Sequence, residues 1–298
     1  MVNKELVEEI KKKAKESLEA KQVDLIIGYQ RASDGVLAVP VFIYKKEDAE
    51  KLIWDAYCVY NLANYLNDFP AQKVGIIAKA CDIKSIIVLL QENQLKRENV
   101  FIIGVECSGV VEEKKTDRYS VKAEDIVYHE KCRACKPAIP VFYDVLISQG
   151  QKKEQPVTEE DIYAAVRKFE AKSLEERFKF WEAEFKRCIR CYACRQVCPM
   201  CYCPRCVADQ SMPGWFSKAA DLGGNLSWNL TRAMHLAGRC IDCGECERAC
   251  PAGISLRDLN RKLQKEIKEM FNYEAGSSID KKPLLAGFDK NDPEEFIK

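Results

Sequence analysis

Two stretches of this chain repeat one cysteine spacing: Cys188-Ile-Arg-Cys191-Tyr-Ala-Cys194-Arg-Gln-Val-Cys198-Pro199 and Cys240-Ile-Asp-Cys243-Gly-Glu-Cys246-Glu-Arg-Ala-Cys250-Pro251. Both follow C-x2-C-x2-C-x3-C-P, the spacing by which thiolates hold a cubane 4Fe-4S cluster. Three cysteines of such a run face one cube, and the proline turns the chain so that the fourth reaches the neighbouring cube. The two runs therefore predict two 4Fe-4S clusters and a protein that transfers electrons.

Crossed ligation divides the eight cysteines into two sets. The first set is Cys188, Cys191, Cys194 and Cys250, and the second set is Cys240, Cys243, Cys246 and Cys198. Zinc ribbons use pairs of C-x2-C without a third cysteine in phase, and disulfide frameworks belong to short secreted domains. Neither alternative predicts the same pattern twice with a proline behind each copy.

Composition limits the classes of function that remain. The chain has 298 residues, 47 basic and 46 acidic side chains and a net charge of +1, so no global field favours nucleic acid or an anionic membrane. No apolar run reaches the roughly 18 residues of a membrane span, and the first ten residues do not resemble a signal peptide. Sixteen cysteines without a secretion signal indicate a cytoplasmic, reducing environment and metal ligation.

The pattern of apolar residues predicts an α+β protein. We expect a small α/β domain with a partly parallel sheet over residues 1–150, a helical connector over 151–187, a ferredoxin-like two-cluster domain over 188–270 and a tail over 271–298.

Within the first domain, the predicted helices and strands alternate so as to form a βαβ unit. Strands are expected at 23–29, 36–44, 74–78 and 100–105, with a turn at Ser33-Asp34-Gly35, and helices are expected over the first 20 residues, 46–66 and 83–91.

The second half is predicted to be helical around its cysteine runs. One long helix is expected over 158–187, and its buried stripe is Ile162, Val166, Phe169, Phe178 and Trp181. A second helix is expected over 256–270. The long stretch between the two runs carries Trp215, Phe216 and Trp228, and it suits a lid or a docking surface.

A further group of cysteines lies in the first domain. Cys81 and Cys107 each follow a predicted parallel strand, and the carboxyl ends of such strands are where open α/β sheets place their ligands. Cys132 and Cys135 come from the next loop and can complete a four-thiolate site. We expect a third 4Fe-4S cluster here, with structural zinc or buried core thiols as alternatives.

Three segments carry a resemblance to a known family. Ile-Ile-Ala-Lys-Ala-Cys81-Asp, Phe-Ile-Ile-Gly-Val-Glu-Cys107-Ser-Gly-Val and Glu-Lys-Cys132-Arg-Ala-Cys135 resemble the beta subunits of deazaflavin-reducing hydrogenases and related formate dehydrogenases. That family has a Pro-Cys-Gln turn, a strand ending in Cys-x-Gly and a C-x2-C around one 4Fe-4S cluster beside FAD. The resemblance implies that Cys81, Cys107, Cys132 and Cys135 hold the third cluster and that FAD lies beside it. Ala80 and Asp82 replace the family's Pro and Gln.

The predicted function follows from the clusters and the resemblance. We expect an iron-sulfur electron-transfer subunit of an anaerobic multi-subunit oxidoreductase, of formate dehydrogenase, hydrogenase or heterodisulfide-reductase type, with no catalytic residues of its own. Its partners are then the other subunits of a redox complex. The alternatives are a flavin-containing subunit that itself reduces a deazaflavin or nicotinamide, and a zinc-binding scaffold.

The remaining cysteines and three cations also have predicted roles. Cys58 is a core thiol or a substitute ligand, whereas Cys201, Cys203 and Cys206 either pack against a cube or hydrogen-bond its sulfurs. Three cations adjoin cluster cysteines and are expected to raise reduction potentials: Arg187, Arg190 and Arg239.

Overall fold

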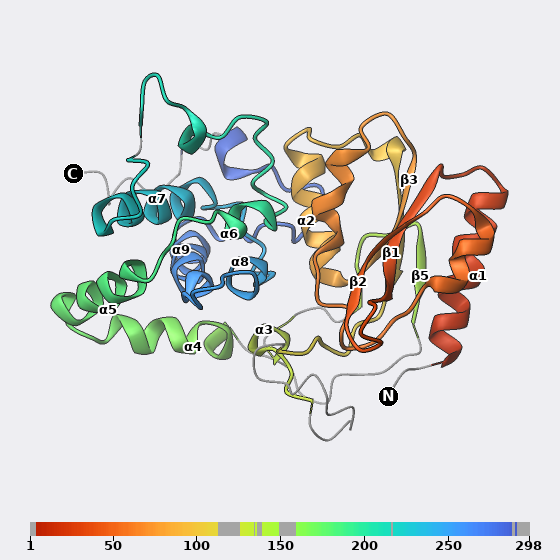
Figure 1. The fold of residues 1–298 in the computed structure, drawn as a ribbon, viewed down its shortest axis with the longest axis horizontal. Helices are drawn as coiled ribbons and strands as arrows, with labels where there is room; N and C mark the ends of the chain where they lie inside the picture. Colours follow the sequence, from red (N-terminus) through yellow and green to blue (C-terminus); the bar gives the residue numbers. More distant parts are fainter. Residues whose placement is uncertain are drawn as a thin grey trace. The chain divides into compact units, whose positions relative to one another are not determined.

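The computed structural model describes residues 4–112, 126–133, 135, 139–148, 159–215, 217–287 and 290 (Figure 1). The chain divides into two compact units, Met1–Thr158 and Glu159–Lys298. The domain border expected near residue 150 falls in a stretch outside the described residues. Among the described residues, no helix combines the length and the apolar character needed to cross a bilayer.

The first unit is built on a five-stranded sheet in the order β2-β1-β3-β4-β5. Its strands are β1 (Leu25–Arg31), β2 (Ala38–Ile43), β3 (Val74–Ala78), β4 (Val100–Val105) and β5 (Val145–Ile147). β1 and β2 form an antiparallel hairpin, whereas β1, β3, β4 and β5 run parallel to one another. The prediction of a partly parallel sheet is confirmed, although β5 was not expected.

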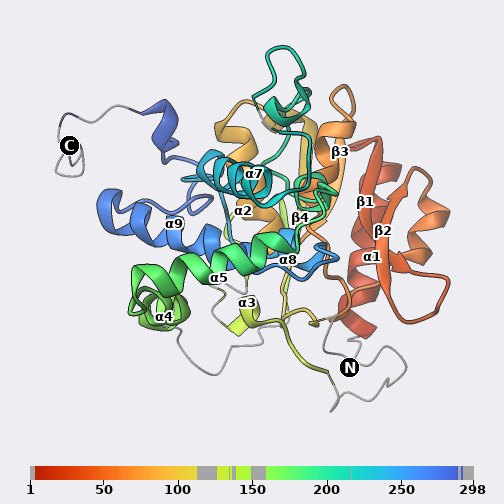
Figure 2. The same cartoon turned by 60° about the vertical axis from the view of Figure 1, so that its left-hand side comes forward.

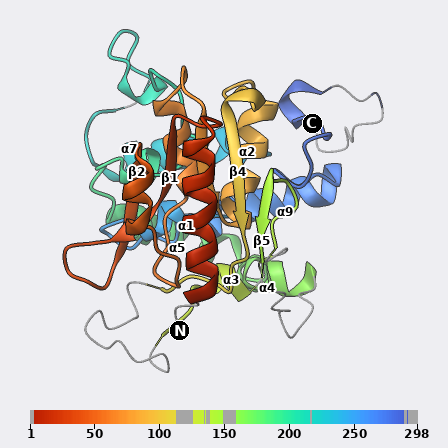
Figure 3. The same ribbon diagram turned by 90° about the vertical axis from the view of Figure 1, so that its right-hand side faces the viewer.

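Helices cover both faces of this sheet. α1 (Lys4–Glu19) lies on one face and α2 (Ala80–Gln91) on the other (Figure 3). Every residue of β3 is buried, as its continuous apolar sequence requires for a strand covered on both sides. The predicted turn between β1 and β2 is present, because the Asp34 carboxylate accepts the N–H groups of Val36 and Leu37 and Gly35 has a φ of +72°. The unit also contains the short helices η3 (Arg97–Asn99) and α3 (Glu130–Arg133).

The helix predicted over residues 46–66 is wrong. Two 3-10 helices, η1 (Lys46–Lys51) and η2 (Leu62–Asp68), stand there with an irregular segment between them. The Asp55 carboxylate accepts the N–H of Tyr57, and the Asn61 side chain accepts the N–H of Ala63. Such local side-chain bonds compete with helical hydrogen bonds and explain the interruption. Cys58 therefore lies in a loop and not on a helix.

The second unit is helical in its described part. Its α-helices are α4 (Glu159–Glu170), α5 (Leu174–Lys186), α6 (Ala193–Gln196), α7 (Leu222–His235), α8 (Glu245–Arg248) and α9 (Leu256–Phe271), and its 3-10 helices are η5 (Val207–Asp209) and η6 (Leu284–Ala286). Helix α7 packs against both α5 and α9 (Figure 2). Phe185, Ile254 and Leu256 form the buried core beneath Cys246 and Cys250.

The single helix predicted over residues 158–187 is also wrong. A new helix starts after Ser173, whose hydroxyl accepts the N–H of Glu176 while the Glu176 carboxylate accepts the N–H of Ser173. This capping box begins α5, so that α4 and α5 are two separate helices. Val166 is buried as expected, but Phe178 is 60% exposed because the break shifts its position around the helix.

A buried ion pair holds the junction between β3 and α2. The Lys79 ammonium lies 3.1 Å from the Asp82 carboxylate, and both side chains are almost fully buried. Lys79 also donates to the carbonyl of Tyr60 at 2.8 Å and to the hydroxyl of Tyr29. Asp82 accepts the backbone N–H groups of Lys79 and Leu62. This network fixes the first turn of α2, where Cys81 lies.

Lys79→Met should weaken this junction strongly, because it leaves the buried Asp82 charge unpaired at a loss of about 3–5 kcal/mol. Hydrogen exchange of the amides of α2, read by mass spectrometry in the whole chain, measures the change. Lys79→Met/Asp82→Asn should recover part of the protection, since the amide keeps an acceptor and removes the charge. Lys179→Met, which breaks an exposed pair with Glu175, is the control. Unchanged protection of α2 in Lys79→Met would contradict the role of the pair.

Candidate metal centres

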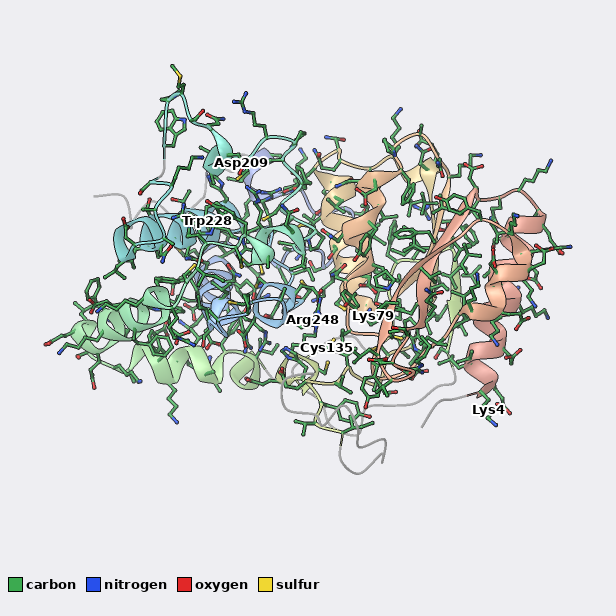
Figure 4. The ribbon with its side chains drawn as sticks, in the orientation of Figure 1. Lys4, Lys79, Cys135, Asp209, Trp228 and Arg248 are labelled. Atoms are coloured by element: carbon green, nitrogen blue, oxygen red, sulfur yellow. The ribbon has the colours of Figure 1, made fainter. Side chains whose placement is uncertain are left out.

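Four cysteines of the first unit gather at one edge of its sheet. Cys81 lies in the first turn of α2 directly after β3, and Cys107 follows β4. Because β3 and β4 are adjacent and parallel, their carboxyl ends meet at the same edge. Cys132 lies on α3 and Cys135 follows it, at the end of the sheet where Lys79 lies (Figure 4).

Electrostatic contacts place these thiols near one another. Burial raises the pKa of Cys107 to about 11, Lys79 lowers it, and Cys132 and Cys135 raise it. Burial and Asp82 raise the pKa of Cys81, against the lowering effect of Lys79.

Backbone donors and a neighbouring thiol surround this group. The N–H of Val110 donates to the Cys132 sulfur at 3.3 Å, and the N–H of Gly109 donates to Cys107. Cys58 is buried near Cys107, and the N–H of Asp55 donates to its sulfur at 3.4 Å. Sulfurs that accept N–H bonds are the usual environment of anionic iron-sulfur clusters.

The first cysteine set of the second unit combines cysteines of both runs. Cys188 follows α5, Cys194 lies on α6, and Cys250 follows α8. Burial raises the pKa of Cys194, Arg232 lowers it, and Cys250, Cys188 and Cys191 raise it in that order. The fourth cysteine of the second run is therefore a neighbour of the first run.

In the second set, Cys198 of the first run lies near cysteines of the second run. Burial raises the pKa of Cys240, and Asp242, Cys246 and Cys198 raise it further. Burial raises the pKa of Cys246 to about 12, Arg232 lowers it, and among the thiols Cys198 raises it most. Cys198 thus lies beside the second run, and Cys243 precedes α8 in the same loop.

The two runs share one backbone conformation. Arg190 and Tyr192 in the first run have φ values of 57° and 59°, and the equivalent positions of the second run, Asp242 and Gly244, have 57° and 72°. A short helix, α6 or α8, follows each pair. Alternation of left-handed and right-handed residues turns backbone N–H groups towards a common anion, as at many iron-sulfur sites.

Side chains and backbone groups also donate to the sulfurs of both sets. The Asn229 amide donates to Cys188 at 3.8 Å and the Asn260 amide donates to Cys246 at 3.7 Å, while the N–H of Ile254 donates to Cys250 at 3.5 Å. Both asparagines are buried. These donors fit a reduced, negatively charged cluster, whose potential they would raise.

The donor sets differ from a single-ion site. Within the described parts of the chain, no three His, Cys, Asp or Glu side chains are arranged to hold one metal ion. A cubane cluster instead distributes its four thiolates over separate irons.

The extra cysteines after the first run are placed differently from one another. The Cys201 thiol hydrogen-bonds Cys198, and this bond, with Arg232 and the N–H of Met200, lowers the pKa of Cys198 against the opposing effect of burial. Cys203 is exposed, and Cys206 accepts a hydrogen bond from Arg195.

The aromatic residues between the runs do not form one surface. Trp228 is only 3% exposed and packs edge-on against Tyr192, so the prediction of a docking role for it is wrong (Figure 4). Trp228 is buried because helix α7 packs its ring against Tyr192 of the first run. Trp215 is 62% exposed, and Phe216 lies outside the described residues.

Arg232, a cation that was not among the predicted residues, contacts both cysteine sets. Its side chain is 4% exposed, and its Nη2 donates to the carbonyl of Cys194 at 2.9 Å. By contrast, Arg187 is 47% exposed and donates to the carbonyl of Ala252. The spacing of Asn225, Trp228 and Arg232 along one helical face was the available signal.

The other two predicted cations contact mainly carbonyl groups and rings. Arg190 donates to the carbonyls of Gly224 and Ser217, and its guanidinium lies over the Tyr192 ring. Arg239 donates to the carbonyl of His235.

Comparisons with known proteins agree with this arrangement. The family model described as a 4Fe-4S dicluster domain matches residues 187–255. The F420-dependent formate dehydrogenase subunit beta of Methanocaldococcus jannaschii is 24% identical, with 90% of this chain and 91% of that protein covered. The F420-dependent formate dehydrogenase 1 subunit beta of Methanococcus maripaludis is 23% identical, with 89% of each covered.

One solved structure is similar to a smaller part of this chain. A chain of the F420-reducing NiFe hydrogenase complex from Methanosarcina barkeri matches with a TM-score of 0.32 and 18% identity, over 38% of this chain and 44% of that one. The resemblance predicted from the sequence is confirmed: over 90% of its length the chain is similar to a beta subunit of F420-dependent formate dehydrogenase, and it carries a 4Fe-4S dicluster domain towards its carboxyl end.

Proposed function

We propose that this chain is an iron-sulfur electron-transfer subunit of an anaerobic multi-subunit oxidoreductase, of the formate dehydrogenase or hydrogenase type. The observation that carries this proposal is that thiols of the two runs lie near one another, Cys250 near Cys194 and Cys198 near Cys240. Crossed cysteine ligation is the arrangement of proteins that pass electrons between two cubanes. The relatives named as formate dehydrogenase beta subunits support the same class of complex.

The ligands that we propose follow the two sets. One cluster is held by Cys188, Cys191, Cys194 and Cys250, and the other is held by Cys240, Cys243, Cys246 and Cys198. The clusters supply one-electron chemistry, and the chain supplies the thiolates, the N–H donors to their sulfurs and a largely buried environment.

A third cluster at the edge of the sheet in the first unit is the next part of the proposal. Its ligands are Cys81, Cys107, Cys132 and Cys135, and the neighbouring thiol of Cys58 is the substitute ligand. The shared sheet edge and the N–H donors to Cys107 and Cys132 support this site. FAD beside it follows from the sequence resemblance, and flavin content of the purified protein tests that point.

The electrons are proposed to pass between a catalytic partner subunit and an acceptor in the cytoplasm. The names of the relatives indicate a deazaflavin as the acceptor class and formate as the donor class. The buried Lys79 ammonium next to Cys81 and Cys107 would favour the reduced form of the third cluster, since its charge is not screened by water.

Anaerobic purification should return about twelve irons and about twelve acid-labile sulfides per chain, because three cubanes contain that number. Metal analysis and sulfide determination measure both. About eight of each would leave the two crossed clusters and contradict the third. Zinc in place of the missing iron would assign Cys81, Cys107, Cys132 and Cys135 to a structural site.

Cys198→Ser should perturb the cluster that Cys240, Cys243 and Cys246 hold, because Cys198 lies beside that set. Electron paramagnetic resonance of the reduced protein distinguishes the two signals. Cys203→Ser, at an exposed cysteine, is the control and should leave both signals intact. Loss of the Cys188 cluster alone in Cys198→Ser would show that the crossed assignment is wrong.

The isolated chain, with all clusters loaded, should not turn over formate, hydrogen, NADH or reduced deazaflavin with an artificial dye. Clusters pass electrons but do not bind organic substrates, so this chemistry belongs to a partner. Dye reduction by dithionite-reduced protein is the control for intact clusters. Sustained flavin-dependent turnover with any of the four donors would overturn the relay function and favour the flavin-containing enzyme.

A further inference from the structure

Helix α7 presents one buried polar face to the cysteine runs. The helix begins at Asp221, whose carboxylate accepts the N–H of Gly224 at 2.7 Å. Asn225 then donates to the carbonyls of Phe185 and Cys188, at 3.0 and 2.8 Å, and so fixes the helix against the end of α5. Arg232 lies two turns further along the same face, and its side chain is 4% exposed.

The Arg232 guanidinium contacts residues of both cysteine sets. Its Nη2 donates to the carbonyl of Cys194, which belongs to the first set. It also hydrogen-bonds the sulfur of Cys198 from the second set and that of Cys201, and Cys246 is a further close thiol. One cation therefore faces thiols of both proposed clusters.

The charge of Arg232 has no carboxylate partner among the described residues. Two other arginines of this unit are paired with carboxylates: buried Arg257 with Asp242 at 2.7 Å, and half-buried Arg248 with Glu245 at 2.8 Å. The Nε atom of Arg232 is buried without a hydrogen-bond partner in the described part of the chain. A buried cation of this kind is unfavourable unless an anion compensates it. Cubane clusters with four thiolate ligands are such anions.

We propose that Arg232 is a positioning residue shared by the two clusters, whose permanent charge raises the reduction potentials of both together. Each cluster gains one negative charge on reduction, and a buried cation stabilises that charge with little screening by water. The guanidinium remains charged over the whole physiological pH range, so its effect does not depend on a proton. This inference rests on the two clusters of the proposed function.

The test is a redox titration of the whole, cluster-loaded chain, followed by electron paramagnetic resonance. In Arg232→Met the equilibrium constant for reducing each of the two clusters should fall about tenfold, which corresponds to about 59 mV for a one-electron couple. Arg187→Met is the matched control: it removes an exposed guanidinium next to Cys188 in the sequence, and it should change both potentials less. Unchanged potentials in Arg232→Met, or equal shifts in both variants, would overturn the proposal.

Arg232→His tests the same charge within one folded protein, even if the methionine variant loses its clusters. Both potentials should be higher at about pH 5.5 than at about pH 9, beyond any pH dependence of the wild type, because the imidazole loses its charge across that interval. A shift of only one cluster, or of neither, would contradict a shared role. Absence of iron from the wild type would instead refute the proposed function, so the two failures are distinguishable.

Discussion

The second unit depends on the proximity of the fourth cysteine of each run to the cysteines of the other run. Cys250 lies beside Cys194, and Cys198 lies beside Cys240. Because thiols of the two runs lie near one another, the segment between the runs must return the chain to its starting point. Helix α7 makes that return by packing against both α5 and α9. The buried core of Phe185, Ile254 and Leu256 then forms beneath the thiols.

Two buried cations show how differently the units neutralise charge. Lys79 is paired with Asp82, three residues away in the sequence, so the polypeptide itself supplies the negative charge that compensates the lysine. Arg232 faces thiols from two separate stretches of the chain, one around the first run and one in the second run. The first arrangement stabilises the polypeptide without any cofactor, whereas the second becomes favourable when the thiols are ionised and ligated. The proposed clusters would thus contribute more to the stability of the second unit than to that of the first.

Much of the fold could be predicted from the sequence, because its strongest signals are local. The apolar runs of β3 and β4 identify buried parallel strands, and the spacing of the two cysteine runs identifies the dicluster domain. Prediction failed where side chains bond to nearby backbone groups: Asp55 interrupts the expected helix, and Ser173 divides another. Helical spacing puts Arg232 on one face with Asn225 and Trp228, but the thiols that it contacts could not be predicted, since they lie in other segments and meet it only through packing.

The repeated backbone conformation of the two runs has a consequence for symmetry. Left-handed residues and short helices recur at equivalent positions, so the loops form two copies of one structural unit. Helices α7 and α9 follow the first and second runs, and each contributes an asparagine donor, Asn229 to Cys188 and Asn260 to Cys246. Cys201, which hydrogen-bonds Cys198, has no equivalent after the second run, where Gly253 stands. Two equivalent copies would give their clusters equal energies. The intervening segment makes the two environments unequal, and inequality between neighbouring electron carriers is what gives a relay a preferred direction.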